Sequence, residues 1–385
     1  MPGRLRGTPP VKIAIVGCGF VADLYMDTLP RHADLQLAGA WDRDPVRLAL
    51  FCRTYDIPAY PSLEALLEDA GVATVLNLTN PHSHYAVSRA CLQAGKHVYS
   101  EKPLAMDAAQ GAELVELARS RGLRLSGAPS RLLGRPAQTA WKLLRDGAIG
   151  RPYLVYAEMD DGLLHRMSVR RWRGRSGAPW PYEDELRVGN TLEHAGYVLT
   201  WLAAFFGPAR SVTAFGARAV EDKRLDVPLR EQAPDVTFAG IEYASGVVAR
   251  LTCSIVASHD HGLRVFGEDG VLSVDDVWKP EAAVRVRRRL TFRGRTTESP
   301  FAPKQKLLGD AEARRLSRGR RKVDFCLGPL ELARAMREGR PSRLSPELCL
   351  HVAEIALAIG QAMDGKARVP IYSRFGPIEP MPWAR

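Results

Sequence analysis

A glycine-rich loop follows the first apolar run of the chain, where residues 11–17 read VKIAIVG. Gly17, Gly19 and Ala22 keep the spacing Gly-x-Gly-x-x-Ala between this run and a helical segment. In such a loop the first glycine permits a tight turn, the second lets the backbone approach a pyrophosphate, and a small third residue allows close helix–strand packing. The N-terminus of the next helix supplies N–H groups to phosphates. The predicted dinucleotide-binding residues of the loop are Gly17, Gly19, Phe20, Val21 and Ala22.

A carboxylate ends the second apolar run, LQLAGAWD, about 20 residues after the loop, where such a fold places an acid on the adenosine ribose. We predict that Asp42 binds the ribose hydroxyls, and that the cofactor is NAD because a carboxylate repels a 2′-phosphate. Arg43 is adjacent and offers the alternative, since it would serve NADP or stack on adenine.

A lysine lies at the end of a later strand-like run, in HVYSEKP at residues 97–103. Parallel α/β sheets bind ligands at the carboxyl ends of their strands, which would place Lys102 near the dinucleotide. There it could donate a proton or hydrogen bond to a reacting oxygen. A solvated surface charge is the alternative, and the neighbouring Glu101 and Pro103 in the same expected crevice favour the functional interpretation.

A histidine occupies the middle of GNTLEHAGYVLTWL, at residues 189–202. His194 follows Glu193 and precedes Tyr197 by three residues. A histidine near its ordinary pKa is suited to act as a general base. The alternative is a polar residue at a helix start, or a histidine whose hydrogen bonds are satisfied between domains.

Two further polar groups lie in the second half of the chain. An arginine-rich loop before residue 189 would suit a carboxylate or phosphate, as in a nucleotide sugar, unless it is a surface loop paired with neighbouring acids. Its basic residues are His165, Arg166, Arg170, Arg171, Arg173 and Arg175. His259, Asp260 and His261 resemble a metal-binding triplet, but adjacent strand residues face opposite ways and no remote third ligand is evident. We expect no metal, and a histidine lining the substrate face instead.

The order of apolar runs predicts the fold that positions these residues. Over residues 11–127 short strands alternate with helices, which is typical of a Rossmann-type, doubly wound parallel sheet. The predicted strands there are 11–17, 35–42, 72–79, 97–103 and 123–128. After Pro129 strands dominate, which indicates an α/β domain with a large, open, mostly antiparallel sheet. We therefore predict domains at 1–128 and 129–385.

Composition limits the expected domain count, cellular location and partners of the protein. The chain has 385 residues, enough for two domains, and its six cysteines are scattered without a Cys-x-x-Cys pair, which fits a reducing cytosol. No signal peptide is visible and the longest apolar run, at 196–206, is too short to span a bilayer, so we expect a cytoplasmic protein without a membrane partner. Residues 279–324 carry 15 Lys/Arg against 5 Asp/Glu. Such a cluster attracts phosphates or nucleic acid, but it lacks nucleic-acid motifs, and a solvated insertion between strands is favoured.

Several of these motifs together resemble the glucose–fructose oxidoreductase, inositol dehydrogenase and MocA-like (Gfo/Idh/MocA) family over nearly the whole chain. AGKHVYSEKPLA, at residues 94–105, is similar to the family's most recognisable motif, and TNPHSH, from Thr79 to His84, resembles its third-strand loop on the nicotinamide side. The resemblance implies that Lys102 contacts cofactor and substrate, that Thr79, His84 and Glu101 belong to the cofactor site, and that the open sheet mediates a homodimer or homotetramer.

The segment around His194 departs from the family pattern G-x-x-L-x-D-x-G-x-H-x-x-D. Aligned on Gly189, Leu192 and Gly196, it places His194 in the Asp position and Val198 in the position of the usual proton-accepting His, with Trp201 in the last Asp position. Three interpretations stay open. His194 is a base displaced by one helical turn; Tyr197 or Lys102 carries the proton, tuned by Glu193 or His194; or hydride transfer has been lost.

The resulting hypothesis is an NAD(P)-dependent oxidoreductase with Lys102, His194 and Tyr197 as candidate catalytic residues. It would move a hydride between nicotinamide and a secondary alcohol or ketone of a sugar-like small molecule, with a nucleotide sugar or another acidic compound as one candidate. Transient oxidation by a recycled cofactor is a variant of this hypothesis. The alternative is a non-catalytic cofactor-binding partner or regulatory protein, which the Val198 substitution favours.

Overall fold

The computed structural model describes residues 9–317, 323–365 and 367–385. The chain forms two compact units. The first contains residues up to 130 together with 168–182 and 324–353, and the second contains 131–167, 183–323 and 354–385. The end of the first long segment lies close to the boundary drawn from the sequence, whereas 168–182 and 324–353 join the first unit from within the region assigned to the second domain.

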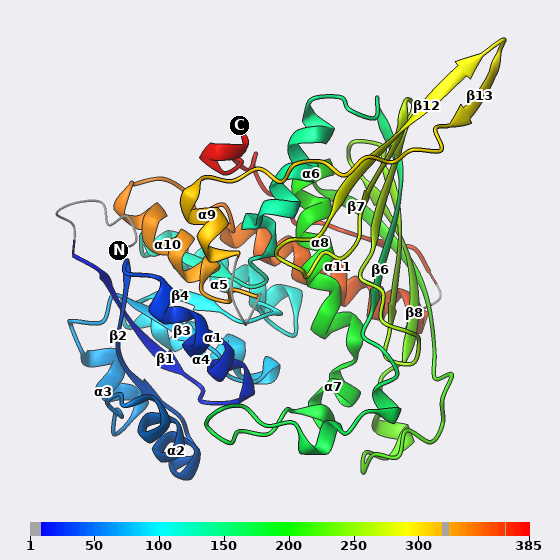
Figure 1. Cartoon of the computed structure of the whole chain (residues 1–385). Coiled ribbons are helices and arrows are strands. Elements are labelled where there is room, and N and C mark those ends of the chain that lie inside the picture. Colours follow the sequence, from blue (N-terminus) through cyan, green and yellow to red (C-terminus); the bar gives the residue numbers. More distant parts are fainter. Residues whose placement is uncertain (1–8, 318–322, 366) are drawn as a thin grey trace. The chain divides into compact units, whose positions relative to one another are not determined.

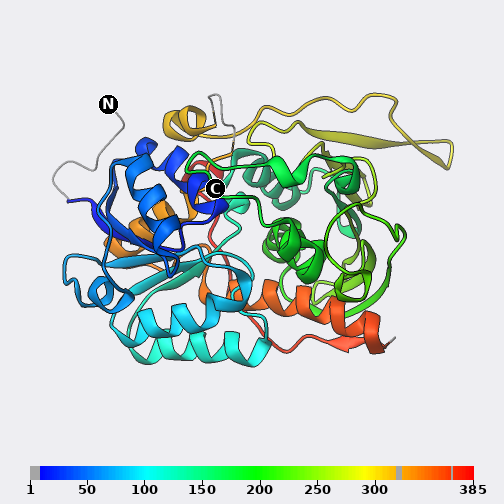
Figure 2. The same cartoon turned by 90° about the horizontal axis from the view of Figure 1, so that it is seen from below.

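The first unit is built on a five-stranded parallel sheet in the order β2-β1-β3-β4-β5 (Figure 1). Its strands are β1 (Val11–Val16), β2 (Leu35–Trp41), β3 (Thr74–Asn77), β4 (His97–Ser100) and β5 (Leu125–Gly127). Its helices are α1 (Phe20–Thr28), α2 (Pro45–Tyr55), α3 (Leu63–Glu68), α4 (His84–Gln93), α5 (Ala108–Ser120) and α10 (Leu327–Arg337). Helices α4 and α5 lie side by side along the sheet (Figure 2), and α10 contacts β2, β4 and β5.

The sequence explains these elements locally. The central strands are mostly apolar, as is usual in a sheet covered by helices, and β3 is buried at all its positions. Helix α2 begins where the Asp44 side chain accepts hydrogen bonds from the N–H groups of Val46 and Arg47, with Pro45 in the first turn. The apolar sides of α3, α4 and α5 share one core cluster with the strands, including Leu66, Leu92 and Leu114. The predicted Rossmann fold is thereby confirmed.

The second unit is built on a nine-stranded sheet in the order β13-β12-β11-β10-β6-β9-β8-β7-β14. Its strands are β6 (Pro152–Asp160), β7 (Ala209–Ala217), β8 (Val236–Tyr243), β9 (Val248–Ser254), β10 (Leu263–Gly267), β11 (Gly270–Val274), β12 (Val284–Phe292), β13 (Arg295–Glu298) and β14 (Val369–Pro370). Only the β6–β9 pair is parallel among these strands, which confirms the mostly antiparallel sheet. Helices α6 (Arg135–Arg145) and α8 (Asn190–Phe206) pack on it.

Alternation along the strands separates a covered face from an exposed one. In β8, Thr237, Ala239 and Ile241 are buried, whereas Phe238 between them is exposed. Phe238 stacks on the exposed Phe215 of β7, with ring centroids 6.5 Å apart. The sheet therefore has one apolar face packed under helices and a second face that carries aromatic side chains in solvent.

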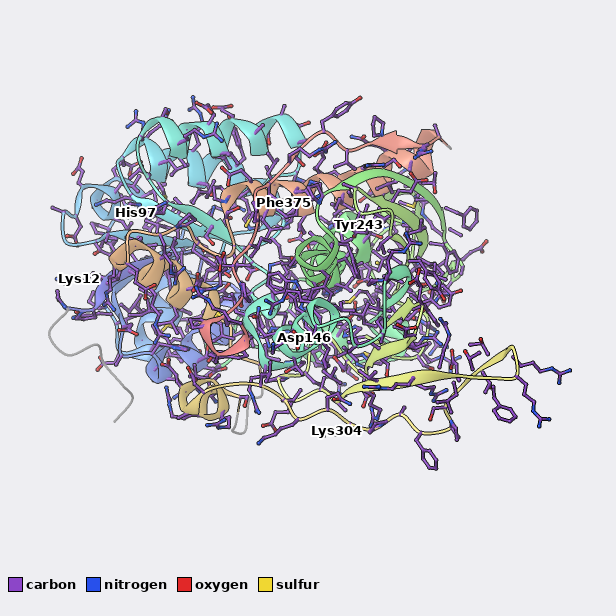
Figure 3. All side chains as sticks on the ribbon, turned by 90° about the horizontal axis from the view of Figure 1, so that it is seen from above. Lys12, His97, Asp146, Tyr243, Lys304 and Phe375 are labelled. Atoms are coloured by element: carbon purple, nitrogen blue, oxygen red, sulfur yellow. The ribbon has the colours of Figure 1, made fainter. Side chains whose placement is uncertain are left out.

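The basic region at 279–324 contains a long hairpin. Strands β12 and β13 extend beyond the other strands of their sheet, and Lys304 lies on the segment that returns from them (Figure 3). The exposed end of β12 and all of β13 are solvated, which fits a solvated insertion between strands. Arg318, Arg320, Arg321 and Lys322 lie outside the described residues.

Three short, polar elements go beyond the sequence prediction. Helices α7 (Tyr182–Val188) and α9 (Ala311–Leu316) and strand β13 are too polar for an apolar period to reveal them. Helix α11 (Pro346–Gly365) alone among the described residues is long and apolar enough to cross a membrane, and 56% of its most apolar window is buried within the protein. Such burial is usual for a core helix.

Candidate functional site

The glycine loop of the first unit has the geometry that a pyrophosphate requires. Gly17 has a φ of +97°, and a Cβ there would lie 2.7 Å from the backbone of Leu78, so a larger residue does not fit. A Cβ on Gly19 would meet none of the described atoms within 4 Å, so that backbone faces open space. Gly19 is also the N-cap of α1, with no side-chain hydrogen bond to the cap. Open space in front of uncapped N–H groups fits a bound pyrophosphate.

Asp42 lies directly after β2, and both of its oxygens are held by backbone. Oδ2 accepts a hydrogen bond from the N–H of Cys18 at 2.7 Å, and Oδ1 accepts one from the N–H of Asp44 at 2.8 Å. Each oxygen keeps a further lone pair for a ribose hydroxyl. The carboxylate is buried, whereas the neighbouring Arg43 is exposed. The residues present thus fit the adenosine ribose of NAD.

A polar network joins the carboxyl ends of β3 and β4. Asn77 accepts a hydrogen bond from the hydroxyl of Thr79 at 2.7 Å and donates to the carbonyl of His84 at 2.9 Å. The Nδ1 of His84 lies 2.8 Å from the carbonyl oxygen of Pro103, and its Nε2 lies 3.0 Å from that of Thr79. Burial lowers the pKa of His84, against the opposing effect of both carbonyls. The ring holds the two strand-end loops together, and the roles of Thr79 and His84 toward the cofactor stay predictions.

Glu101 connects the Lys102 loop to helix α1. Its Oε1 accepts a hydrogen bond from the hydroxyl of Tyr25 at 2.7 Å, and its Oε2 accepts one from the N–H of Lys102 at 3.2 Å. Burial, followed by the charge of Glu101, raises the pKa of Tyr25, so this phenol stays protonated and donates. The Lys102 side chain is half-buried at the carboxyl end of the sheet, where the sequence places it.

The segment 168–182 is anchored to the first turn of α1 through Asp23. The buried Asp23 carboxylate accepts hydrogen bonds from the Tyr55 hydroxyl at 2.6 Å and from the Ser176 hydroxyl at 3.0 Å. A Cβ on Gly174 would lie 1.7 Å from Asp23 Oδ2, so close approach requires glycine there. The guanidinium of Arg175 lies over the Tyr55 ring, 5.5 Å from its centroid. This contact explains why 168–182 belongs to the first unit.

The arginines expected to attract an acidic substrate are exposed in this segment and just before it. Those with exposed side chains are Arg166, Arg170, Arg171, Arg173 and Arg175. Arg173 donates hydrogen bonds to the carbonyls of Arg170 and Trp172, so its guanidinium is folded back on its own loop.

In the second unit, His194 lies on the first turns of α8 with polar groups around both ring nitrogens. Asn190, one turn earlier on the same helix face, contacts His194 Nδ1 through its side-chain oxygen. The Asn190 amide is oriented by donating to the carbonyl of Met159 at 3.0 Å. The Nε2 of His194 lies 3.7 Å from an oxygen of Glu185, which is too far for a hydrogen bond. His194 is therefore part of a polar cluster and not an isolated helix-start residue.

Asp161 bridges two histidines at the end of β6. Its Oδ2 lies 2.5 Å from His194 Nδ1, and its Oδ1 lies 2.9 Å from His261 Nε2. Burial opposes ionisation of Asp161, but the charge of His194 and hydrogen bonds from both histidines keep its pKa below the usual range. A carboxylate that accepts a hydrogen bond from the Nδ1–H of a histidine keeps the proton on Nδ1 and leaves the Nε2 lone pair available as a base.

Aromatic rings enclose this cluster. The ring of Trp278 lies edge-on to those of Tyr197, His261 and His194, with centroids 4.7, 4.9 and 5.6 Å apart. Tyr197 is buried and its ring centroid lies 6.3 Å from that of His194. Val198, which takes the family's usual histidine position, is fully buried in the core. Because its side chain is a hydrocarbon, it cannot transfer a proton.

Sequence reasoning finds the histidines but not the groups that orient them. Asp161, Asn190, Glu185 and Trp278 come from four separate segments, and no local spacing connects them. One signal was available for Asn190, since it precedes His194 by four residues in a helical segment. Asp161 follows β6 directly, in the run EMDD at residues 158–161.

Two family models match the chain in succession. Residues 11–128 match the oxidoreductase family with an NAD-binding Rossmann fold, and residues 137–273 match the GFO/IDH/MocA C-terminal domain. The first match covers the glycine loop, Asp42 and Lys102, and the second covers Asp161, His194 and His261.

Known proteins similar to the chain are dehydrogenases and oxidoreductases. The trans-1,2-dihydrobenzene-1,2-diol dehydrogenase of Bos taurus is 29% identical over 298 residues, 76% of this chain and 79% of that protein. An NAD binding oxidoreductase from Klebsiella pneumoniae superposes with a TM-score of 0.76 at 20% identity, over 95% of this chain and 100% of its own. The WlbA dehydrogenase of Bordetella pertussis, solved with NADH and UDP-GlcNAcA, gives 0.72 at 18% identity, over 94% and 98%. At such identities the two structures show a common fold.

Proposed function

The chain belongs to the Gfo/Idh/MocA family of NAD-binding oxidoreductases, and from this premise we propose that it oxidises a ring secondary alcohol, or reduces the matching ketone, with His194 as the proton-transferring group. The observation that carries the proposal is the contact of Asp161 with His194 Nδ1 at 2.5 Å. It supplies a positioned base although Val198 fills the family's usual histidine position.

The proton balance follows from the orientation of His194. In the direction of oxidation, the substrate hydroxyl proton passes to His194 Nε2 while Asp161 stabilises the imidazolium through Nδ1. Bound NAD supplies the hydride acceptor. We propose that Lys102 hydrogen-bonds to the substrate oxygen and stabilises its developing negative charge. In the reverse direction the imidazolium returns the proton to the ketone oxygen.

We infer the substrate class from two compounds, one in the name of a relative and one bound in a similar structure, which share a secondary ring hydroxyl group. The bovine relative is named for a cyclic 1,2-diol, and the Bordetella dehydrogenase was solved with a nucleotide sugar acid. Both compounds carry secondary hydroxyls on six-membered rings. The exposed arginines of 168–182 support an acidic sugar or nucleotide sugar over a neutral diol.

Turnover at the nicotinamide absorbance band tests the proposal. Sugars, inositols, nucleotide sugars and trans-dihydrodiols are offered to wild-type protein and to the variants His194→Gln, Tyr197→Phe and Lys102→Met, with His97→Gln as a control outside the cluster. We expect His194→Gln to lower kcat by about 100-fold or more and Tyr197→Phe to lower it less. A large loss in Tyr197→Phe with an active His194→Gln would make Tyr197 the proton carrier.

The family assignment favours an enzyme over a non-catalytic cofactor-binding protein, because the similar proteins are named as dehydrogenases. Binding of NAD without turnover of any compound in the panel, in either direction, would restore that alternative. The exposed aromatic face of β7 and β8 supports the proposal of a homodimer or homotetramer, which light scattering would measure. The six free cysteines support a cytoplasmic location.

A further inference from the structure

Sheet register brings three ligand-type side chains together in the second unit. Strands β10 and β11 are antiparallel, and Leu263 pairs with Val274. Continuing that register by two residues places His261, before β10, opposite Asp276, after β11, and the N–H of Val277 donates to the carbonyl of His261 at 2.9 Å. His259 is two residues from His261 and so shares its side of an extended chain. Asp276 is the remote third ligand that the sequence alone does not reveal.

One distance among these side chains equals the edge of a tetrahedral metal coordination shell, and the others are longer. His259 Nε2 lies 3.3 Å from Asp276 Oδ2, and His261 Nδ1 lies 3.9 Å from Asp276 Oδ1. One ligand atom from each of the three residues lies within 4.8 Å of the others. Tetrahedral zinc with bonds of about 2.0–2.1 Å separates its ligand atoms by roughly 3.3–3.4 Å. Only shifts of the side chains are needed to reach that geometry.

A buried nitrogen without a hydrogen-bond partner points to the ligand. His261 is 1% exposed, and its Nδ1 has no hydrogen-bond partner among the described residues. Its other nitrogen, Nε2, lies 2.9 Å from Asp161 Oδ1, which fixes a proton on Nε2 and leaves a lone pair on Nδ1. A metal-bound histidine usually has this arrangement, with its second nitrogen donating to a carboxylate.

A lysine ammonium group lies beside the three candidate ligands. The ammonium of Lys279 lies 3.1 Å from Asp276 Oδ2, and its side chain is 65% exposed. Because the side chain is largely solvated, it can turn away when a divalent ion binds. The exposed His259 offers the entry path.

We propose that His259 Nε2, His261 Nδ1 and an Asp276 oxygen bind a zinc-type divalent metal ion, with a fourth position left for water or another ligand. Two imidazoles and one carboxylate suit zinc, cobalt or nickel, whereas magnesium and calcium prefer oxygen ligands throughout. The site shares Asp161 with His194, so a bound metal would fix the His261 ring and, through it, the carboxylate that orients the proposed base. Binding of the metal does not depend on hydride transfer.

Metal titration of the untagged, full-length protein tests this site. After treatment with chelator and its removal, Co²⁺ is added and the visible absorption of a tetrahedral complex is recorded, and Zn²⁺ is then titrated in competition with a chromophoric chelator. We expect one ion per chain, displacement of Co²⁺ by Zn²⁺, and no competition from Mg²⁺.

Three variants separate a built site from general surface binding. His259→Ala should weaken Zn²⁺ binding by about 100-fold, because it removes one of three ligands. Lys279→Ala should tighten binding several-fold, since it removes a competing ammonium whose side chain is 65% exposed. Asp260→Asn, an exposed acid between the two histidines, should change nothing.

Unchanged Zn²⁺ affinity in His259→Ala, weaker or unchanged binding in Lys279→Ala, or no stoichiometric binding by the wild type would each overturn the proposal. Circular dichroism of each variant excludes misfolding as the cause of a loss.

Discussion

The two units differ in how their functional residues are brought together. In the first unit the glycine loop, Asp42 and the Lys102 loop each follow one strand of a parallel sheet, and hydrogen bonds from backbone N–H groups to the Asp42 and Glu101 carboxylates hold them. In the second unit Asp161, His194 and His261 come from a strand end, a helix and a loop, and side chains hold one another. Cofactor binding thus depends on backbone shape, whereas the proposed proton transfer depends on the ionic contacts of a few side chains.

The largest expected effect is in the glycine loop. Gly17→Ala forces a Cβ into the backbone of Leu78 at a positive φ, so NAD affinity should fall by more than about 100-fold and stability by roughly 2–3 kcal/mol. Fluorescence titration with NADH and thermal melts measure the two effects. Gly122→Ala is the control, because Gly122 has a φ of +63° but nothing within 4 Å of its Cβ position. Equal losses in both variants would mean that backbone strain, and not close approach, dominates.

The anchor between α1 and the segment 168–182 should be the next most sensitive. Gly174→Ala places a methyl group against Asp23 Oδ2, which is already held by Tyr55 and Ser176, and should cost about 1–3 kcal/mol of stability. Urea unfolding measures this cost, and limited proteolysis should find the segment cleaved faster. Gly360→Ala, in a helix with open space around the site, should be neutral or stabilising. A neutral Gly174→Ala would show that the anchor contributes little to the first unit.

Asp42 should set the preference between the two nicotinamide cofactors. Asp42→Asn removes the negative charge that disfavours a 2′-phosphate, so the ratio of NAD to NADP affinity should fall by about 10-fold. Asp44→Asn retains a helix cap two residues away and should leave the ratio unchanged. Parallel titrations with both reduced cofactors give the ratio. An unchanged ratio in Asp42→Asn would transfer the discrimination to another residue.

The smallest expected effect concerns Asp160, a partly buried carboxylate of the second unit with three other acids near it. Burial, followed by the charges of Glu158, Asp260 and Asp161, raises the pKa of Asp160 to about 7. Because the folded-state pKa lies above the unfolded one, the stabilisation from this group is complete below about pH 4 and is lost as the pH rises toward 7. Asp160→Asn should therefore match the wild type at pH 4 and exceed it by about 1–2 kcal/mol at pH 8.

Denaturation at both pH values measures this difference, with the exposed Asp146→Asn as a control. A variant that is less stable than the wild type at pH 8 would show that the ionised Asp160 carboxylate is stabilised in the fold.

The contrast between the units also explains what the sequence predicts. Alternating apolar runs were enough for the order of strands and helices, and the glycine spacing placed the dinucleotide loop correctly after β1. The His84 ring between two carbonyls and the Tyr25–Glu101 contact were not predictable, because they depend on side-chain packing between loops that only the folded sheet brings together.

The polar cluster of the second unit was harder still to predict. Its key pairings are Asp161 with His194, Asp161 with His261, and His261 with Asp276, and their partners are 33, 100 and 15 residues apart in the sequence. They follow from strand register and from the position of α8 on the sheet, neither of which a single sequence specifies. The departure at Val198 was the one local sign that the base had to come from elsewhere.

The most direct measurement compares Asp161→Asn with Asp260→Asn for NADH binding and for the pH dependence of kcat/KM. We predict that both variants bind NADH within about twofold of the wild type, while Asp161→Asn alone loses about 100-fold in kcat. Removal of a carboxylate that favours the imidazolium should also move the acidic limb of its profile to lower pH. Turnover and pH profile in Asp161→Asn equal to those of Asp260→Asn would contradict the assignment of His194 and Asp161 as the proton-transferring pair.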